Sequence, residues 1–331
     1  MRVIHWSLCN SSGLDIVARD IVKAERSFGI DSNWANSADE SAEYLKKYIE
    51  SEPVDIHCVH SHLPNSVSRK DKKIIWFSHG TPEYVFQSSI EEGLLKRHGA
   101  NDYWTMKMYY MQHSDVIITF WPRHQAIIKS LCDKNARVEC IPMGIDKAFW
   151  YPVSSKGKYF GNPSLFTAEN CHAIKWPYDL FIAWPWVTEQ FPNAKLHISN
   201  LPYDQHRWWF PLMTRNGTLF KAYANAKLNR EELRDAFVST DYYIGLVRYG
   251  DFNRMCLEAK ACGAKVISYF GNEYADYWIK EGDQRNIAKQ LISILQGDVA
   301  PRETLQVLDI SETVKCLIDM YKSILQWYAW V

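Results

Sequence analysis

Residues 249–266 read YGDFNRMCLEAKACGAKV, and their second half has the pattern of a short helix that ends at a glycine and runs directly into a strand. Glu258 stands at the centre of this helix among small residues, and Gly263 occupies the place where helices commonly end in a left-handed conformation. The residues KVISYF at 265–270 then form an apolar run with the length of a buried strand. The stretch is therefore one helix–strand unit of an α/β fold, and its helix carries a single carboxylate.

The same alternation of strand and helix patterns extends along the rest of the chain. In the first half, strands are expected at 3–8, 55–61, 73–79, 115–121 and 137–143, with helices at 12–29, 83–97, 102–113 and 122–132. In the second half, strands at 164–169, 194–199, 241–247 and 265–270 alternate with helices at 178–190 and 230–238 and with the helix of Glu258. Because the strands are apolar along nearly their whole length, they predict parallel sheets that helices cover on both faces.

The chain of 331 residues is longer than one hydrophobic core usually serves, so two domains are expected. The segment VSSKGKYFGNPS, which follows Pro152, is rich in Gly, Ser, Pro and Lys and has no periodicity, as is typical of a linker. We therefore expect a Rossmann-like domain at 1–152 and a second one at 153–310. The last segment, 311–331, predicts a long amphipathic helix that has Ser311 as its N-cap and joins the first domain.

Composition excludes several classes of protein. Lys and Arg number 38, as do Asp and Glu, so the chain lacks the basic excess of a non-specific nucleic-acid binder. The eight cysteines show no CxxC pair and no Cys/His metal spacing, which predicts free thiols in a reducing compartment and no metal site. The N-terminus lacks the apolar core of a signal peptide, and no stretch approaches 18 apolar residues. We expect a cytoplasmic protein without stable membrane insertion.

The stretch LEAKACGAKVIS resembles the second half of the signature of glycosyltransferase family 4, in which an acid and a Phe-Gly pair precede E-A-x-A-C-G-x-P-V-I. Phe252 and Glu258 match the phenylalanine and the glutamate of that signature. Further blocks resemble those of the family in the same order along the chain: HSHLP, FSHGTPEY, YYMQHSDVIITF, IPMGIDKAFWYP and TAENCHAIKWPYDLFIAW. The resemblance covers most of the chain and implies an α/β protein with the GT-B fold, in which two Rossmann-like domains face a cleft.

The resemblance also implies an activity and a set of site residues. Such enzymes are retaining hexosyl- or pentosyltransferases that move a sugar from a UDP- or GDP-linked donor to a hydroxyl group and need no cofactor. Glu258 would accept hydrogen bonds from the ribose, Lys175 would bind the diphosphate, and His79 would contact the donor sugar. Gly13 would offer the backbone N–H groups of a helix start to phosphate. No D-x-D pair occurs in the sequence, in keeping with a metal-independent mechanism.

The chain departs from the family pattern at four places. Asn253 replaces the glycine of the Phe-Gly pair, and Lys265 replaces the proline of the signature. Asn170 occupies the position of an arginine that normally stands five residues before the lysine, and Gly250 that of the first acid of the signature. A divergent enzyme would use Asp251 and Arg248 in their place. Each candidate also has a purely structural explanation: an ion-paired helix residue for Glu258, a histidine satisfied at the sheet edge for His79, and solvated side chains for Lys175 and Asp251.

Three functions remain open at this point. The first is a glycosyltransferase whose acceptor is either a glycan or glycolipid, or a hydroxymethylated pyrimidine in DNA, in a bacterial or virus-infected cell. The second is a GT-B protein that binds a nucleotide-sugar without turnover, which the loss of the arginine and the first acid would explain. The third is a GT-B epimerase, for which the sequence shows no acid set near the donor sugar.

Overall fold

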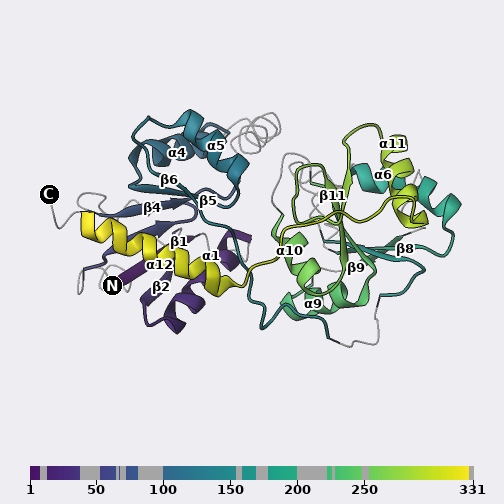
Figure 1. Cartoon of the computed structure of the whole chain (residues 1–331), viewed down its shortest axis with the longest axis horizontal. Helices are drawn as coiled ribbons and strands as arrows, with labels where there is room; N and C mark the ends of the chain where they lie inside the picture. Colours follow the sequence, from purple (N-terminus) through teal and green to yellow (C-terminus); the bar gives the residue numbers. More distant parts are fainter. Residues whose placement is uncertain are drawn as a thin grey trace. The chain divides into compact units, whose positions relative to one another are not determined.

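The structure is a computed structural model, and it describes residues 1–7, 13–37, 53–64, 67, 72–80, 100–153, 159–168, 178–199, 222–225, 228–247 and 253–327. The chain forms two compact units, the first made of 1–146 with 308–331 and the second of 147–307 (Figure 1). The chain therefore passes from one unit to the other after Asp146 and returns after Val307.

The first unit is built on a six-stranded sheet in the order β2-β1-β3-β4-β5-β6, in which all neighbouring strands are parallel (Figure 1). Its strands are β1 (Arg2–Ser7), β2 (Asp31–Asn36), β3 (Ile56–Val59), β4 (Ile74–Phe77), β5 (Val116–Thr119) and β6 (Val138–Cys140). The strand order reverses between β1 and β3. In open α/β sheets, ligands bind beyond the carboxyl ends of the strands at such a point.

The helices of the first unit are α1 (Gly13–Ser27), α4 (Ala100–His113), α5 (Pro122–Leu131) and α12 (Ile310–Trp327). The last of these lies alongside α1, so α12 packs on the first unit (Figure 1). The expectation that Ser311 is its N-cap was wrong. Asp309 is the cap: its carboxylate accepts a hydrogen bond from Ser311 N at 2.9 Å, and Glu312 accepts one from Asp309 N at 3.0 Å.

The second unit contains a six-stranded parallel sheet in the order β12-β11-β10-β7-β8-β9. Its strands are β7 (Ser164–Thr167), β8 (Lys195–Ser199), β9 (Ala222–Asn225), β10 (Tyr242–Gly245), β11 (Lys265–Tyr269) and β12 (Tyr277–Ile279), and its helices are α6 (Tyr178–Gln190), α9 (Arg230–Ser239), α10 (Arg254–Ala261) and α11 (Gln284–Gln296). Numbered within the unit, the strand order is 3-2-1-4-5-6, which is the order of dinucleotide-binding domains. The point of reversal lies between β7 and β10.

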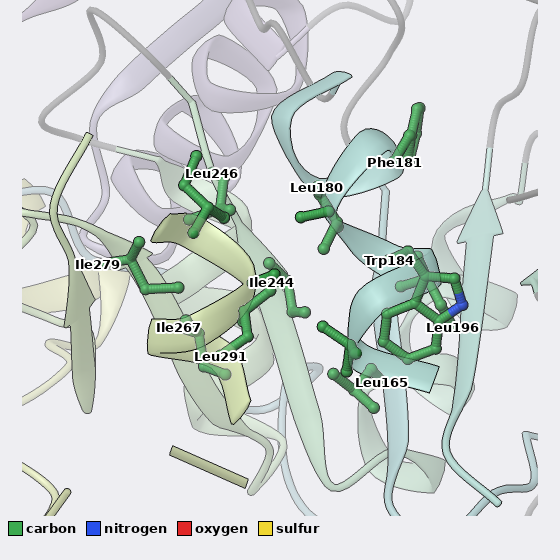
Figure 2. Packing of buried hydrophobic residues seen from close by; sticks show 14 of the residues in the cluster. Leu165, Leu180, Phe181, Trp184, Leu196, Ile244, Leu246, Ile267, Ile279 and Leu291 are labelled. Carbon is green, nitrogen blue, oxygen red and sulfur yellow. The ribbon is translucent and has the colours of Figure 1, made fainter. Parts of the chain in front are cut away.

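A single apolar cluster holds α6 and α11 against this sheet. Figure 2 shows Trp184 of α6 beside Leu165 and Leu196 of the strands, and all three side chains are fully buried. Leu291 of α11 packs on Ile267 in the same cluster. Both helices are therefore packed tightly against the strands of the second sheet, whose carboxyl edge carries the loops.

Gly144 belongs to the block IPMGIDKAFWYP, and its lack of a side chain lets the returning C-terminal segment approach. A Cβ atom at Gly144 would lie 2.6 Å from the Asp309 carbonyl carbon and 2.8 Å from Ile310 N. We expect Gly144→Ala to lower the free energy of unfolding by about 2–3 kcal/mol, because the clash is with backbone that cannot rotate away. Urea denaturation would measure it, with Gly13→Ala, whose added Cβ meets nothing within 4 Å, as the control. Equal stability of the two variants would contradict this interpretation.

Candidate functional site

One candidate site, in the second unit, is the start of α10, which follows the carboxyl end of β10 at the reversal point of the second sheet. Asn253 caps the helix by accepting a hydrogen bond from Met255 N at 3.1 Å. Gly245, the last residue of β10, lets the helix lie close to the strand, since a Cβ there would be 2.8 Å from Cys256 Sγ. The positive end of the α10 dipole is thus placed at the sheet edge where α/β proteins bind phosphorylated ligands.

Glu258 lies one turn into this helix and is buried, with 5% of its surface exposed. Its Oε1 atom accepts a hydrogen bond from Arg254 Nε at 2.8 Å, which makes an ion pair four residues apart on one face of α10. Arg254 was not among the candidates from the sequence, although its spacing from Glu258 is the signal for such a pair. Cys262 at the end of the same helix is no nucleophile, because burial and the Glu258 carboxylate raise the pKa of its thiol to about 12.

Four of the expected site residues, Lys175, Asn170, Arg248 and Asp251, lie outside the described residues. A fifth, Gly13, is the first residue of α1. The Asp15 carboxylate lies in the first turn of α1, where it accepts hydrogen bonds from Arg19 Nε at 3.1 Å and from Ser7 Oγ at 3.3 Å. An anion at Gly13 would be repelled by this nearby carboxylate. Of the starts of α1 and α10, that of α10 therefore suits phosphate better.

A second candidate site, in the first unit, is a row of histidines. His5 lies in β1, His60 directly follows β3, and His79 follows β4, so three adjacent strands bring the rings together. His60 Nδ1 is 2.8 Å from His79 Nε2, and His60 Nε2 is 2.9 Å from His5 Nδ1. At the inner end, His5 Nε2 is 3.0 Å from Oε2 of Glu25, a residue of α1. The sequence singled out only His79 of this histidine row (Glu25, His5, His60 and His79).

Glu25 is fully buried and is surrounded by hydrogen-bond donors. Besides His5, it accepts hydrogen bonds from Ser32 Oγ at 2.5 Å and from the hydroxyl of Tyr321 at 2.8 Å. Tyr321 comes from α12, so the C-terminal helix completes the inner end of the row. None of these partners is recognisable as a site residue in the sequence, because each is an ordinary residue of a core strand or helix.

The charges along the row follow from burial and from these contacts. Burial by itself disfavours the charged form of His5, but the neighbouring Cys58 and the Glu25 carboxylate together raise its pKa to about 10. Burial would raise the pKa of Glu25, yet the interaction with His5 and the hydrogen bonds lower it. For His60, burial and the other two histidines lower the pKa well below its usual value. At neutral pH the row therefore holds a Glu25 carboxylate, a His5 imidazolium and a neutral His60.

Two further properties bear on the expected chemistry. Within the part of the chain that the structure describes, no group of three or more His, Cys, Asp and Glu side chains is arranged to hold a metal ion. Of the helices described, none is both long enough and apolar enough to cross a membrane. The six cysteines in the part of the chain that the structure describes are free thiols.

No family model matches the chain, and no curated protein matches it in sequence. Solved structures, in contrast, match the chain in fold. Sucrose-phosphate synthase from Thermosynechococcus elongatus superposes with a TM-score of 0.76 over 100% of both chains at 14% identity. WaaG, a glycosyltransferase involved in lipopolysaccharide biosynthesis, gives 0.65 over 96% of this chain and 95% of its own at 13% identity. HepE from Anabaena, in complex with UDP-glucose, gives 0.63 over 100% of both chains at 11% identity.

These superpositions extend over nearly the whole of each chain, so they include both α/β units. At such low identity the likeness establishes the fold. The chain has the two-domain GT-B fold of glycosyltransferases, as the resemblance implied.

Proposed function

We propose that the protein is a retaining glycosyltransferase that transfers a sugar from a nucleoside-diphosphate donor to a hydroxyl acceptor without a metal ion. The observation that carries the proposal is the buried Glu258 one turn into α10, whose start lies at the reversal point of a Rossmann-ordered sheet in a GT-B protein. Solved structures with this fold include HepE with UDP-glucose and the pneumococcal transferase GtfA with UDP and GlcNAc, which supports a UDP-linked donor.

The role proposed for each residue is the one that the family resemblance implies, and charge complementarity supports those at the diphosphate. The α10 N-terminus faces the negative diphosphate and, with Lys175, Asn170 and Arg248, stabilises the charge that develops on the leaving group. Glu258 accepts hydrogen bonds from the ribose hydroxyls and is held in place by Arg254. His79 and Asp251 contact the donor sugar and orient it toward the acceptor. Gly13 takes part as a lesser backbone donor.

The experiment that tests this proposal is incubation of the full chain with a panel of UDP- and GDP-sugars. Release of the free nucleoside diphosphate reports turnover, and calorimetry reports binding. Glycan, glycolipid and hydroxymethylated DNA acceptors are included, and transfer is read as a mass shift of one sugar. Failure of every donor to bind would overturn the proposal.

A second function, nucleotide-sugar binding without turnover, is favoured by the two departures at Asn170 and Gly250. The same panel separates the two functions. A donor that binds tightly but is neither hydrolysed nor transferred to any acceptor identifies the protein as a binding protein.

Transfer is expected to survive excess EDTA, because the proposed stabilisation of the leaving group uses helix dipole and side-chain cations. The measurement is the initial rate with and without EDTA, followed by readdition of Mg²⁺ or Mn²⁺. A rate that disappears on chelation and returns with either metal would show that a bound cation does this work.

Asp251 is proposed to replace the acid that the family has at the position of Gly250. We expect Asp251→Asn to lower kcat/KM at least roughly tenfold, a loss of about 1.4 kcal/mol of transition-state binding. Asp298→Asn, at an exposed position beyond α11, is the matched control. Wild-type turnover of a folded Asp251→Asn variant would show that the site works without this acid.

A further inference from the structure

The histidine row connects a fully buried carboxylate to a half-buried ring at the edge of the first sheet. Its three links have distances of 3.0, 2.9 and 2.8 Å from Glu25 to His79, and every heavy-atom pair is within hydrogen-bond range. His5, His60 and Glu25 are buried, while His79 is partly exposed. His60 also stacks on Phe77, with ring centroids 4.3 Å apart, so its ring has little freedom to turn.

Hydrogen counting along the row determines which nitrogen of each ring carries a hydrogen. An ionised Glu25 can only accept, so His5 Nε2 carries a hydrogen. Each of the two imidazole–imidazole links needs one donor and one acceptor. If His5 also carries a hydrogen on Nδ1, His60 must accept at Nε2 and, being neutral, donate from Nδ1. His79 then accepts at Nε2, and when neutral it carries its own hydrogen on Nδ1.

The reverse direction requires a different state of His5. A neutral His5 with its hydrogen on Nε2 accepts at Nδ1, which forces His60 to donate from Nε2 and His79 to donate from Nε2. The proton on His5 Nδ1 therefore decides the tautomer of His79, two rings away. The Glu25 carboxylate stabilises that proton, and the hydroxyl groups of Ser32 and Tyr321 hold the carboxylate in place.

We propose that Glu25, His5 and His60 are positioning residues that hold His79 as the Nδ1–H tautomer, in which the ring nitrogen that does not face His60 carries the hydrogen. The oxygen atoms of a sugar or a phosphate are the acceptors that such an N–H donor recognises. Only this last step rests on the proposed function. The tautomer itself is a property of the unliganded protein.

The direct test is a long-range ¹H–¹⁵N NMR spectrum of the full chain with ¹⁵N-labelled histidine, recorded at neutral pH without any nucleotide. His79 is assigned by its loss in His79→Gln. We expect a protonated-type shift at its Nδ1 and an unprotonated-type shift at its Nε2, with both nitrogens of His5 protonated. A wild-type His79 that carries its hydrogen on Nε2 overturns the proposal. Because this measurement uses the wild-type protein, it does not depend on the folding of a variant.

A pair of variants tests whether the row is the cause. His60→Phe keeps an aromatic ring beside Phe77 but removes both links, so His79 Nε2 loses its donor and the fraction of the Nδ1–H form should fall. The control is His57→Asn, which changes a buried histidine of β3 that does not belong to the row. His57 accepts a hydrogen bond from Trp6 Nε1 at 3.1 Å, and the asparagine side chain retains an acceptor for it. An unchanged His79 tautomer in His60→Phe overturns the proposal, as does an equal change in both variants.

The functional consequence is measured separately. With a donor that the panel identifies, His60→Phe should lower kcat/KM roughly tenfold, the effect of losing one well-placed hydrogen bond, while His57→Asn retains wild-type kinetics. If the spectrum shows the Nδ1–H tautomer and no nucleotide-sugar binds, the proposed function fails but the role of the histidine row in setting the tautomer stands. If nucleotide-sugars turn over and the His79 tautomer is Nε2–H, the role assigned to the histidine row fails but the proposed function stands.

Discussion

Glu258→Ala is expected to weaken nucleotide-sugar binding roughly ten- to hundredfold and to lower the free energy of unfolding by about 3–5 kcal/mol. The loss of affinity follows from removing a charged acceptor for the ribose hydroxyls. The loss of stability follows because the Arg254 guanidinium, whose side chain is 13% exposed, remains without the carboxylate that lies 2.8 Å from it. Calorimetric titration with the nucleotide and urea denaturation measure the two effects independently.

A double variant separates the structural role of Glu258 from its role in binding. Arg254→Met combined with Glu258→Leu replaces the buried ion pair by apolar side chains of similar length, which is commonly neutral or stabilising. We expect this variant to regain most of the lost stability and none of the lost affinity. Unchanged nucleotide affinity in a folded Glu258→Ala protein would show that the residue serves only the helix, and full affinity in the double variant would show the same.

Glu25→Ala is expected to lower the free energy of unfolding by about 3–5 kcal/mol near pH 6, because it leaves the buried His5 imidazolium without its counter-charge. The hydroxyl groups of Ser32 and Tyr321 lose their acceptor at the same time. Urea denaturation of both proteins gives the difference, and Asp319→Ala, which removes an 82% exposed carboxylate from the helix of Tyr321, is the control.

The deficit of Glu25→Ala should depend on pH in a defined direction. The pKa of His5 is raised from 6.5 to about 10, so its contribution to stability is fully present below pH 6.5 and is lost as the pH rises toward 10. The pKa of Glu25 is lowered from 4.5, so its contribution is present above pH 4.5 and is lost as the pH falls through the folded value. The deficit is therefore largest between about pH 4.5 and 6.5 and shrinks at pH 9.5.

Only the difference between the two proteins shows this trend. Burial lowers the pKa of Lys107 from 10.5 to about 7, so its own contribution to stability increases with pH between these values and opposes that of His5. The stability curve of the wild type by itself can thus be flat in this range. Subtracting the curve of the variant cancels the Lys107 contribution, and a deficit that grows toward pH 9.5 would contradict the assigned charges of the pair.

The strands that the sequence predicted and those that it missed differ in one property. Most of the predicted strands lie inside a sheet, where both faces are covered and the residues are apolar, as in IIWF of β4 and VIIT of β5. The missed strands β2, β9 and β12 are all at sheet edges. The sequence DSNWAN of β2 carries no apolar run, because an edge strand buries only part of its surface. The expected helix at 83–97 lies outside the described residues.

The residues of the two candidate sites, one in each unit, also differ in whether the local sequence reveals them. Glu258 could be named from the sequence because its neighbours within one helix carry the signature, and the local spacing already contains its partner Arg254. His79 could be named from its place at the end of a strand. Nothing in the sequence connects it with His60, 19 residues away, or connects His5 with Glu25, 20 residues away.

The sequence by itself therefore determined the strand–helix alternation of the two α/β halves, the existence of the last helix and the place of Glu258 in its helix, because each depends on periodicity or spacing within one or two elements. Only the tertiary structure decided which partners His79 has. Parallel pairing of β1, β3 and β4 sets three histidines side by side, and α1 and α12 bring Glu25 and Tyr321 to the inner end across a separation of 296 residues. Such contacts depend on strand order and register, which are set by the packing of the whole unit.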